Sequence, residues 1–190
     1  MRTQITEIKL PEGSFQVVAD FFEHKDLKSL AKIYKDWRDL SNLLNSFNAR
    51  SVNLPEGLSE VAFCYFMNCV RLNNPKIGKG VNTSFDAYSL NAKKRIQIKS
   101  CSVVPDLTSF GPKSQWDELY FQDFYRKGDW DYTFDIYKIP NNLIYNQKVN
   151  KTQTLSQMQL EGKRPRFSIY KEIILKAGLK PIKTCDLRNI

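Results

Sequence analysis

Residues 58–72 constrain the fold most strongly, because this segment is apolar on nearly every side when it is drawn as a helix. Its apolar positions include Val61, Ala62, Phe63, Tyr65, Phe66, Met67 and Val70. A helix of this kind is expected where other elements pack on more than one of its sides. At 190 residues the chain is long enough to bury one substantial core, so we expect a single domain over residues 1–190.

An amphipathic helix is expected before the buried one, from Asp26 to about residue 45. Apolar side chains recur there every three or four residues, and Asp26 is a suitable N-cap. Residues 48–57 should form a loop, because Pro55 and Gly57 interrupt any regular structure. The two helices are therefore expected to be separate elements joined by a short connection.

Two short segments after the helices are expected to pair as a hairpin. Residues 83–88 and 95–104 have strand character, and residues 90–94 between them are long enough only for a turn. Strands joined in this way are antiparallel neighbours. The sequence therefore predicts that side chains of these two segments meet across a sheet.

The rest of the chain is expected to add strands and one more helix. Residues 118–124 and 132–139 are strand candidates joined by a turn, which suggests a second hairpin. Residues 141–166 are polar and should be mostly loop with a short helical turn. An amphipathic helix is expected over residues 168–177, and residues 180–187 can add a final short strand.

The charge and the histidine content narrow the chemistry. A formal charge of +9 and a pI near 9.3 would attract a polyanion, and nucleic acid is the commonest such partner, although many basic proteins bind none. The sole histidine, His24, lies in a charged stretch and is expected on the surface. Nucleases with paired histidines, histidine-rich metal sites and Ser-His-Asp hydrolases are therefore difficult to assemble. Carboxylates, amides and lysines must supply any catalysis.

The sequence shows neither a targeting segment nor a cysteine framework. Residues 1–6 lack the apolar stretch of a signal peptide, and no later run is long enough to cross a bilayer, so we expect a cytoplasmic protein that does not enter a membrane. The cysteines have no CxxC spacing and lie among apolar residues, which is typical of small core side chains. They are Cys64, Cys69, Cys101 and Cys185. We expect neither a zinc site nor a disulfide.

Three side chains of the first expected hairpin have the chemistry of a phosphodiester-cleaving site. Strand alternation places Gln97 and Lys99 on one face, and the hairpin brings Asp86 opposite them. Hydrolysis of a phosphodiester needs a cation, a positioned water and a group that favours hydroxide. Mg²⁺ held by Asp86, the Gln97 amide oxygen and the Ile98 carbonyl would supply the first two, and Lys99 could orient or acidify the water.

This pattern resembles the PD…(D/E)xK nuclease superfamily, in which an aspartate is followed after a spacer by Glu or Asp, any residue, and Lys. The resemblance implies an α/β fold, with a restriction-endonuclease-like central mixed β-sheet flanked by helices, and Mg²⁺-dependent cleavage. Phe85 stands where the pattern often has proline, at a variable position. Gln97 replaces the usual acid, and a missing charge pair at contact corresponds to ~4 kcal/mol at an effective dielectric of ~20.

Glu60 is the candidate for a carboxylate that compensates for this missing charge. It lies in the first turn of the buried helix, where many members of the superfamily carry an acidic residue that faces the active site. The resemblance therefore implies that Glu60 joins the metal and catalytic set, with Asp117 and Asp123 as weaker candidates. The structural alternative is that Glu60 only complements the helix dipole.

The surrounding sequence is similar to the small restriction endonucleases that recognise the interrupted palindrome GCNGC. The similarity is greatest over residues 55–124, including 108–112 and 116–121, and in the basic C-terminal part. It implies a type II restriction endonuclease that cuts double-stranded DNA and leaves a short 5′ overhang. A palindromic site further implies a two-fold symmetric homodimer, with one active site for each strand.

Sequence-specific contacts to DNA are expected from basic side chains outside the catalytic hairpin. The first candidates lie in an amide-rich C-terminal segment and the next in loops after the catalytic strand: Lys163, Arg164 and Arg166, then Lys113, Arg126 and Lys127. These residues could instead contact only phosphates, or nothing.

Two other functions remain open from the sequence. One is a structure-directed repair or junction-cleaving nuclease, in which the same catalytic residues would serve. The other is a non-catalytic basic DNA-binding protein, in which Gln97 and Lys99 are the solvated face of a strand.

Overall fold

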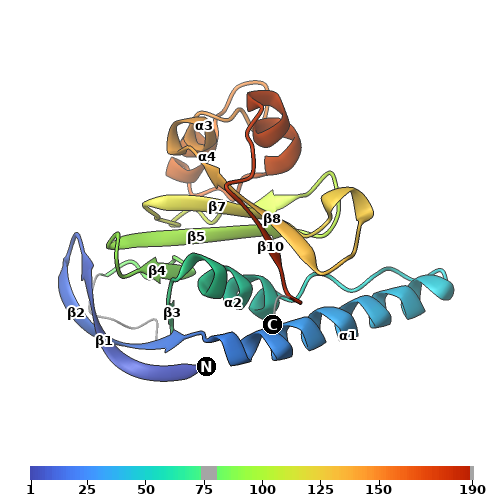
Figure 1. Ribbon diagram of the computed structural model, residues 1–190. Coiled ribbons are helices and arrows are strands. Elements are labelled where there is room, and N and C mark those ends of the chain that lie inside the picture. Colours follow the sequence, from blue (N-terminus) through green and yellow to red (C-terminus); the bar gives the residue numbers. More distant parts are fainter. Residues whose placement is uncertain (74–80, 189–190) are drawn as a thin grey trace.

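The computed structural model describes residues 1–73 and 81–188, and its centre is a curled five-stranded mixed sheet (Figure 1). The strand order is β10-β8-β7-β5-β4, in which β5 and β7 are parallel and the other neighbours are antiparallel. The strands are β4 (Ala87–Ser89), β5 (Lys94–Cys101), β7 (Glu118–Asp123), β8 (Thr133–Ile139) and β10 (Lys183–Asp186). A central mixed sheet is the architecture that the family resemblance implied.

Helices cover both faces of this sheet (Figure 1). One face packs against α1 (Leu27–Ser46) and α2 (Glu56–Met67). The opposite face is covered by α3 (Asn141–Tyr145), α4 (Leu155–Leu160) and the π-helical segment η3 (Tyr170–Leu175). Two short 3-10 turns are η1 (His24–Asp26), before α1, and η2 (Arg126–Gly128), after β7. The α/β fold class expected from the sequence is therefore confirmed.

Alternation along the strands divides the buried side chains into two cores. On β7, Tyr120 packs toward α2, where the ring centroid of Phe63 lies 5.0 Å from its own, whereas Leu119 joins the core beneath the C-terminal helices. On β5, Ile96 and Ile98 join the core beneath α1 and α2. Because successive strand residues point to opposite faces, Gln97 and Lys99 face the other side of the sheet from these two isoleucines.

An N-terminal hairpin, which the sequence pattern did not indicate, builds a separate three-stranded sheet. In it β1 (Arg2–Leu10) pairs with β2 (Gly13–Phe21), and β2 pairs with β3 (Arg71–Leu72). Side chains of this hairpin pack against Tyr88 of β4 to form a third core. The hairpin is therefore joined to the edge of the central sheet that carries β4.

The predicted helices and the first predicted hairpin are confirmed, with shifted ends. The buried helix begins earlier than expected, directly after Pro55, and ends earlier, at Met67, because Asn68 adopts a left-handed conformation with φ 52°. The expected end at residue 72 is wrong, since Arg71–Leu72 forms β3. The strand expected over residues 83–88 is confined to β4, which is nevertheless the antiparallel neighbour of β5.

The later elements follow the prediction more closely. β7 and β8 pair as antiparallel neighbours, and β10 is the expected final strand. The last helix runs over residues 169–177. The region expected to be mostly loop contains both α3 and α4, and α4 begins with a reciprocal capping box between Thr154 and Gln157.

The cysteines and the histidine lie where their sequence context indicated. All four cysteines are buried and are free thiols, and His24 is exposed. Within residues 1–73 and 81–188, the helices are too short or too polar to cross a bilayer.

Replacing Phe63 by alanine tests the packing of α2 on the sheet. Phe63 is fully buried, whereas Phe47, at the end of α1, is 75% exposed. Phe63→Ala should lower the free energy of unfolding by about 3–5 kcal/mol, because it leaves a cavity. Phe47→Ala should change it by less than about 0.5 kcal/mol. Denaturant titration followed by circular dichroism measures both, and equal effects would contradict the buried position of α2.

Candidate active site

Asp86 and Gln97 face each other across the β4–β5 pair. The register that joins Ala87 to Ile96 continues one residue further, where the Asp86 backbone N–H donates to the Ile96 carbonyl at 2.9 Å. Asp86 Oδ2 accepts one hydrogen bond from the Ile98 backbone N–H at 2.7 Å and another from Gln97 Nε2. Gln97 is only 3% exposed, so its amide is held against the Asp86 carboxylate inside the protein.

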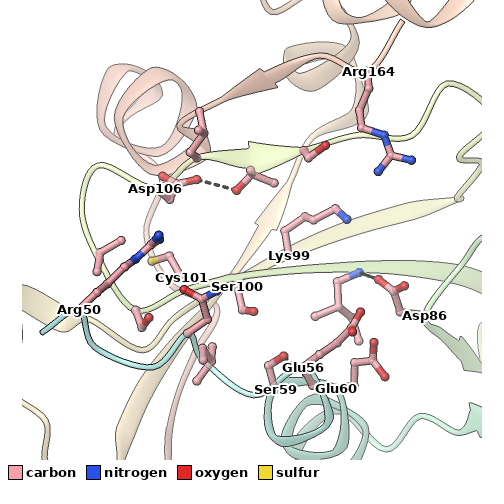
Figure 2. Close-up of a pocket in the computed structure, with 18 residues that line it drawn as sticks. Arg50, Glu56, Ser59, Glu60, Asp86, Lys99, Ser100, Cys101, Asp106 and Arg164 are labelled. Carbon is pink, nitrogen blue, oxygen red and sulfur yellow. Dashed lines mark hydrogen bonds between the residues drawn. The ribbon is translucent and has the colours of Figure 1, made fainter. Parts of the chain in front are cut away.

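Asp86 and Lys99 line one open pocket with a volume of about 630 Å³ (Figure 2). The pocket lies between the start of α2, the strand β5, the loop that follows β5, and Arg164. Its lining residues are Arg50, Asn53, Leu54, Glu56, Ser59, Glu60, Asp86, Ile98, Lys99, Ser100, Cys101, Ser102, Val103, Asp106, Leu107, Thr108, Ser109 and Arg164. The first predicted hairpin therefore carries an acid and a base into the same cavity.

Lys99 extends from β5 into this pocket, between Asp86 and Arg164 (Figure 2). Its ammonium nitrogen lies 5.6 Å from the ring centroid of Phe110, and it forms no ion pair with any carboxylate in the described part of the chain. Burial raises the pKa of the Asp86 carboxyl, and the charge of Lys99 opposes this shift. Lys99 is therefore placed to meet a phosphate or a water in the cavity.

Burial and mutual repulsion act on the two acidic groups at the centre of the site. Burial raises the pKa of Asp86 above its ordinary value, against the opposing effects of the Ile98 N–H and Lys99. Burial, with the nearby charges of Asp86 and Glu56, raises the pKa of Glu60 to about 7. A bound cation would therefore stabilise the charged form of both carboxyl groups.

Arg71 of β3 connects Glu60 to the N-terminal hairpin. Its guanidinium lies 3.7 Å from Glu60 Oε2 and 3.6 Å from Oδ2 of Asp20, which is buried on β2. The positive charge opposes the upward shift in the pKa of Glu60. The small N-terminal sheet thus helps to orient an acidic side chain of the pocket.

Three further charged residues of the pocket escaped the sequence analysis, namely Glu56, Arg50 and the buried Asp106. Glu56 lies one helical turn before Glu60, so both carboxylates lie on the same side of α2. Arg50 lies on the loop before α2, and Figure 2 shows its side chain across the pocket from Asp86. The four-residue spacing of the two glutamates was a signal in the sequence, whereas nothing near Arg50 marked it.

The two weaker acidic candidates lie outside the pocket. Asp117 forms an ion pair with Arg95 at 2.9 Å. Asp123 is buried and accepts hydrogen bonds from the backbone N–H groups of Tyr125 and Arg126 at 2.9 and 3.0 Å. Neither is among the lining residues, so the structure brings Glu60 and not these two to Asp86.

The basic candidates for DNA contact in the C-terminal segment differ in position. Arg164 is exposed and lines the pocket, whereas Arg166 is exposed on β9 (Arg166–Phe167) and does not. Lys163 forms an ion pair with Glu161 at 2.5 Å. Of these three, Arg164 is therefore the one that the structure places at the candidate active site.

The other three basic candidates lie away from the pocket. Arg126 forms ion pairs with Asp135 at 3.3 Å and with Asp131 at 3.6 Å. Lys127 and Lys113 are exposed, and the backbone carbonyl of Lys113 accepts a hydrogen bond from the Asn82 side chain. Because Arg126 is engaged by two carboxylates, it is a weaker candidate for DNA than the sequence indicated.

The donor set of the pocket fits a hard divalent cation. Among residues 1–73 and 81–188, no three His, Cys, Asp or Glu side chains are arranged to hold a metal ion by themselves. Asp86 and Glu60 supply two carboxylates to the pocket, which Ile98 of β5 also lines, whereas Gln97 is not among the lining residues and directs its amide nitrogen to Asp86. Mg²⁺ prefers such oxygen ligands and retains several of its waters.

Two comparisons relate this chain to known restriction enzymes. A family model described as Bsp6I restriction endonuclease matches residues 22–176, which include α1, α2, β4, β5 and Arg164. The chain is 33% identical over 159 residues to the type II restriction enzyme Bsp6I of Bacillus sp. (strain RFL6), a match that covers 83% of this chain and 86% of that enzyme. No solved structure matches. The chain belongs to the Bsp6I restriction endonuclease family and is a site-specific deoxyribonuclease.

Proposed function

We propose that this protein is a Mg²⁺-dependent type II restriction endonuclease of the PD…(D/E)xK superfamily, and that it cuts both strands of a short interrupted palindrome in cytoplasmic DNA. The observation that carries the proposal is the position of Asp86 directly before β4 and of Gln97 and Lys99 on the neighbouring strand β5, with Asp86 and Lys99 lining one pocket. The similarity to small endonucleases that recognise GCNGC favours that sequence as the target, cut to leave a short 5′ overhang.

Asp86, Glu60, the Gln97 amide oxygen and the Ile98 carbonyl are the proposed metal ligands. Gln97 now directs its amide nitrogen to Asp86. A half-turn about the last side-chain bond of Gln97 would exchange nitrogen for oxygen and present an acceptor beside the carboxylate. When bound, Mg²⁺ would neutralise charge on the phosphate and favour the hydroxide form of a bound water.

Lys99 is proposed to act on the scissile phosphate and the attacking water. Its ammonium group lies in the pocket without an ion-pair partner among the described residues, so its charge is available to the substrate. An ammonium near the attacking water stabilises its deprotonated form, and near the phosphate it stabilises the developing negative charge. Arg50 and Arg164, on other walls of the pocket, are proposed to bind neighbouring phosphates.

A homodimer is proposed as the active form. Cutting both strands of a palindrome needs two active sites related by a two-fold axis, which two copies of this chain would supply. Within each copy we infer one endonuclease domain over residues 1–190, because the central sheet takes strands from both the middle and the end of the chain.

Membership of a restriction endonuclease family favours this proposal over the two alternatives. A junction-cleaving nuclease could use the same residues, but the matched family is one of restriction enzymes. A non-catalytic DNA-binding protein would leave the acidic groups of the pocket unexplained, because buried carboxylates repel phosphate.

Digestion of plasmid DNA in the presence of Mg²⁺ tests the proposed activity. Discrete fragments are expected, and sequencing of their ends should place each cut within GCNGC with a short 5′ overhang. Absence of cutting across a range of divalent cations and plasmids would contradict the proposal. Smears or branch-dependent nicks would instead favour a structure-directed nuclease.

Asp86→Ala and Lys99→Ala should each lower the rate of cleavage by at least about 10²-fold, because each removes a group that acts on the reacting phosphate. Binding of DNA should fall by far less than the rate of cleavage, since phosphate contacts are spread over many basic groups. Lys94→Ala is the matched control, because Lys94 is exposed at the start of the same strand. Single-turnover cleavage and fluorescence anisotropy measure the two properties. Unchanged cleavage in Lys99→Ala would remove Lys99 from the mechanism.

Gln97→Glu places a second carboxylate against Asp86. Without a divalent cation, the repulsion should lower the free energy of unfolding by on the order of 1–4 kcal/mol. Mg²⁺ should reverse the loss, so the rise in melting temperature on its addition should exceed that of the unsubstituted protein. Thermal unfolding with and without Mg²⁺ measures this difference. The variant should still cleave DNA, with the same or a changed metal preference. A folded variant that shows no added response to Mg²⁺ would contradict the proposed ligand role.

A further inference from the structure

Asp106 is a buried carboxylate in the wall of the active-site pocket, and the proposed chemistry gives it no role. It lies on the loop after β5 and is only 5% exposed. Its Oδ2 accepts hydrogen bonds from the Thr108 hydroxyl at 2.7 Å and the Ile169 backbone N–H at 3.0 Å. Its Oδ1 accepts from the Ser168 hydroxyl and from the Tyr170 backbone N–H at 3.1 Å.

These four donors use the full capacity of the Asp106 carboxylate. An ionised carboxyl group has about four acceptor positions, two on each oxygen. A metal ion or a water at Asp106 would therefore have to displace a donor that is itself buried, at the cost of leaving that donor unsatisfied. Asp106 is thus unsuited to be a metal ligand or a general base, although it lines the same pocket as Asp86 and Lys99.

The hydrogen bonds of Asp106 join two segments that are far apart in the sequence. One is the loop that leaves β5, and the other is the start of the last helix, at residues 168–170. Next to this junction, β6 (Thr108–Ser109) pairs with β9, and the Phe110 backbone N–H donates to the Pro165 carbonyl at 3.1 Å. The result is a two-stranded ribbon, β6–β9, that is tied at one end by Asp106.

Arg164 lies at the other end of this ribbon. Figure 2 shows Asp106 at one end of β6 and Arg164 beyond the opposite end, with the Arg164 side chain over the pocket. Arg164 forms no ion pair within the described part of the chain, and its backbone continues through Pro165 directly into β9. The position of its guanidinium therefore depends on the ribbon.

We propose that Asp106 is a positioning residue, which anchors the β6–β9 ribbon so that Arg164 is held over the pocket to bind a phosphate of the DNA. The proposal rests on the function proposed above. Although Asp106 is negatively charged, it would favour the binding of DNA, because it acts through Arg164.

The sign of the effect separates positioning from simple electrostatics. If Asp106 acted only through its charge, Asp106→Asn would strengthen DNA binding, because it removes a negative charge near the phosphates. In the positioning role the same change weakens binding, because an amide nitrogen cannot accept the two hydrogen bonds made by the oxygen it replaces. The side of the ribbon that faces the last helix then loosens.

A double-substitution cycle with Arg164 tests the proposal. Asp106→Asn and Arg164→Ala should each raise KM for a DNA duplex that carries the mapped site by about tenfold, the cost of one charge-assisted contact, with kcat changed by less than about twofold. The combined variant should be no worse than about tenfold, because Asp106 acts through Arg164. A hundredfold effect of the double variant, or tighter binding by Asp106→Asn, would overturn the proposal.

Asp123→Asn is the matched control, since Asp123 is also a buried, hydrogen-bonded aspartate of this half of the protein but lies outside the pocket. It should leave KM unchanged, and an equal rise in KM would mean that Asp106 contributes only to general stability. If Asp106→Asn fails to fold, Thr108→Val serves as a second variant, because it removes one hydrogen-bond donor from the carboxylate. It should raise KM by a smaller factor. When combined with Arg164→Ala, it should raise KM no further than Arg164→Ala alone.

The failure of this inference is distinguishable from failure of the proposed function. DNA binding by the same variants is also measured by anisotropy without divalent cations, so the readout does not require cleavage. Normal binding by Arg164→Ala would overturn the positioning role of Asp106. It would not bear on the proposed roles of Asp86 and Lys99 in cleavage.

Discussion

The candidate active site depends on one carboxylate, which is held by hydrogen bonds between two neighbouring segments of the chain. Asp86 on one side of the β4–β5 pair accepts hydrogen bonds from the Ile98 backbone and the Gln97 amide on the other. Both faces of β5 are buried, so its register is strongly constrained, and a slip of one residue would turn Gln97 and Lys99 into the core beneath α2. The packing of Ile96 and Ile98 therefore sets the face of β5 from which Gln97 meets Asp86 and Lys99 enters the pocket.

The pocket combines acidic groups with cations in a way that suits DNA cleavage. Glu56 and Glu60 come from one helix and Asp86 from the sheet, whereas Arg50, Lys99 and Arg164 come from separate segments. Carboxylates attract a divalent ion, and the three basic groups, which form no ion pair among the described residues, attract the phosphates that the ion acts on. With Gln97 in place of an acid, the proposed metal site would rely on Glu60, whose charge the Arg71 guanidinium partly neutralises.

The sequence was sufficient to predict the parts of the site that depend on local pattern. Alternation in β5 predicted the direction of Gln97 and Lys99, and the short turn predicted the antiparallel neighbour that carries Asp86. Contacts between distant segments were not predicted. Arg71, which lies beside Glu60, also pairs with Asp20 of the N-terminal hairpin, and Asp106 bonds to Ser168 at the start of the last helix, 62 residues later in the chain. Such contacts depend on how the layers pack, which no short sequence window contains.

Crystals of the protein soaked with Mn²⁺ give the most direct test of the convergence of Asp86, Gln97 and Glu60 on one cation. Mn²⁺ takes the same oxygen ligands as Mg²⁺ and is located by its anomalous scattering. We expect a peak between the Asp86 carboxylate and the Gln97 amide, with the amide oxygen turned toward it. A peak elsewhere in the molecule, together with an empty pocket beside Asp86, would contradict the proposed metal site.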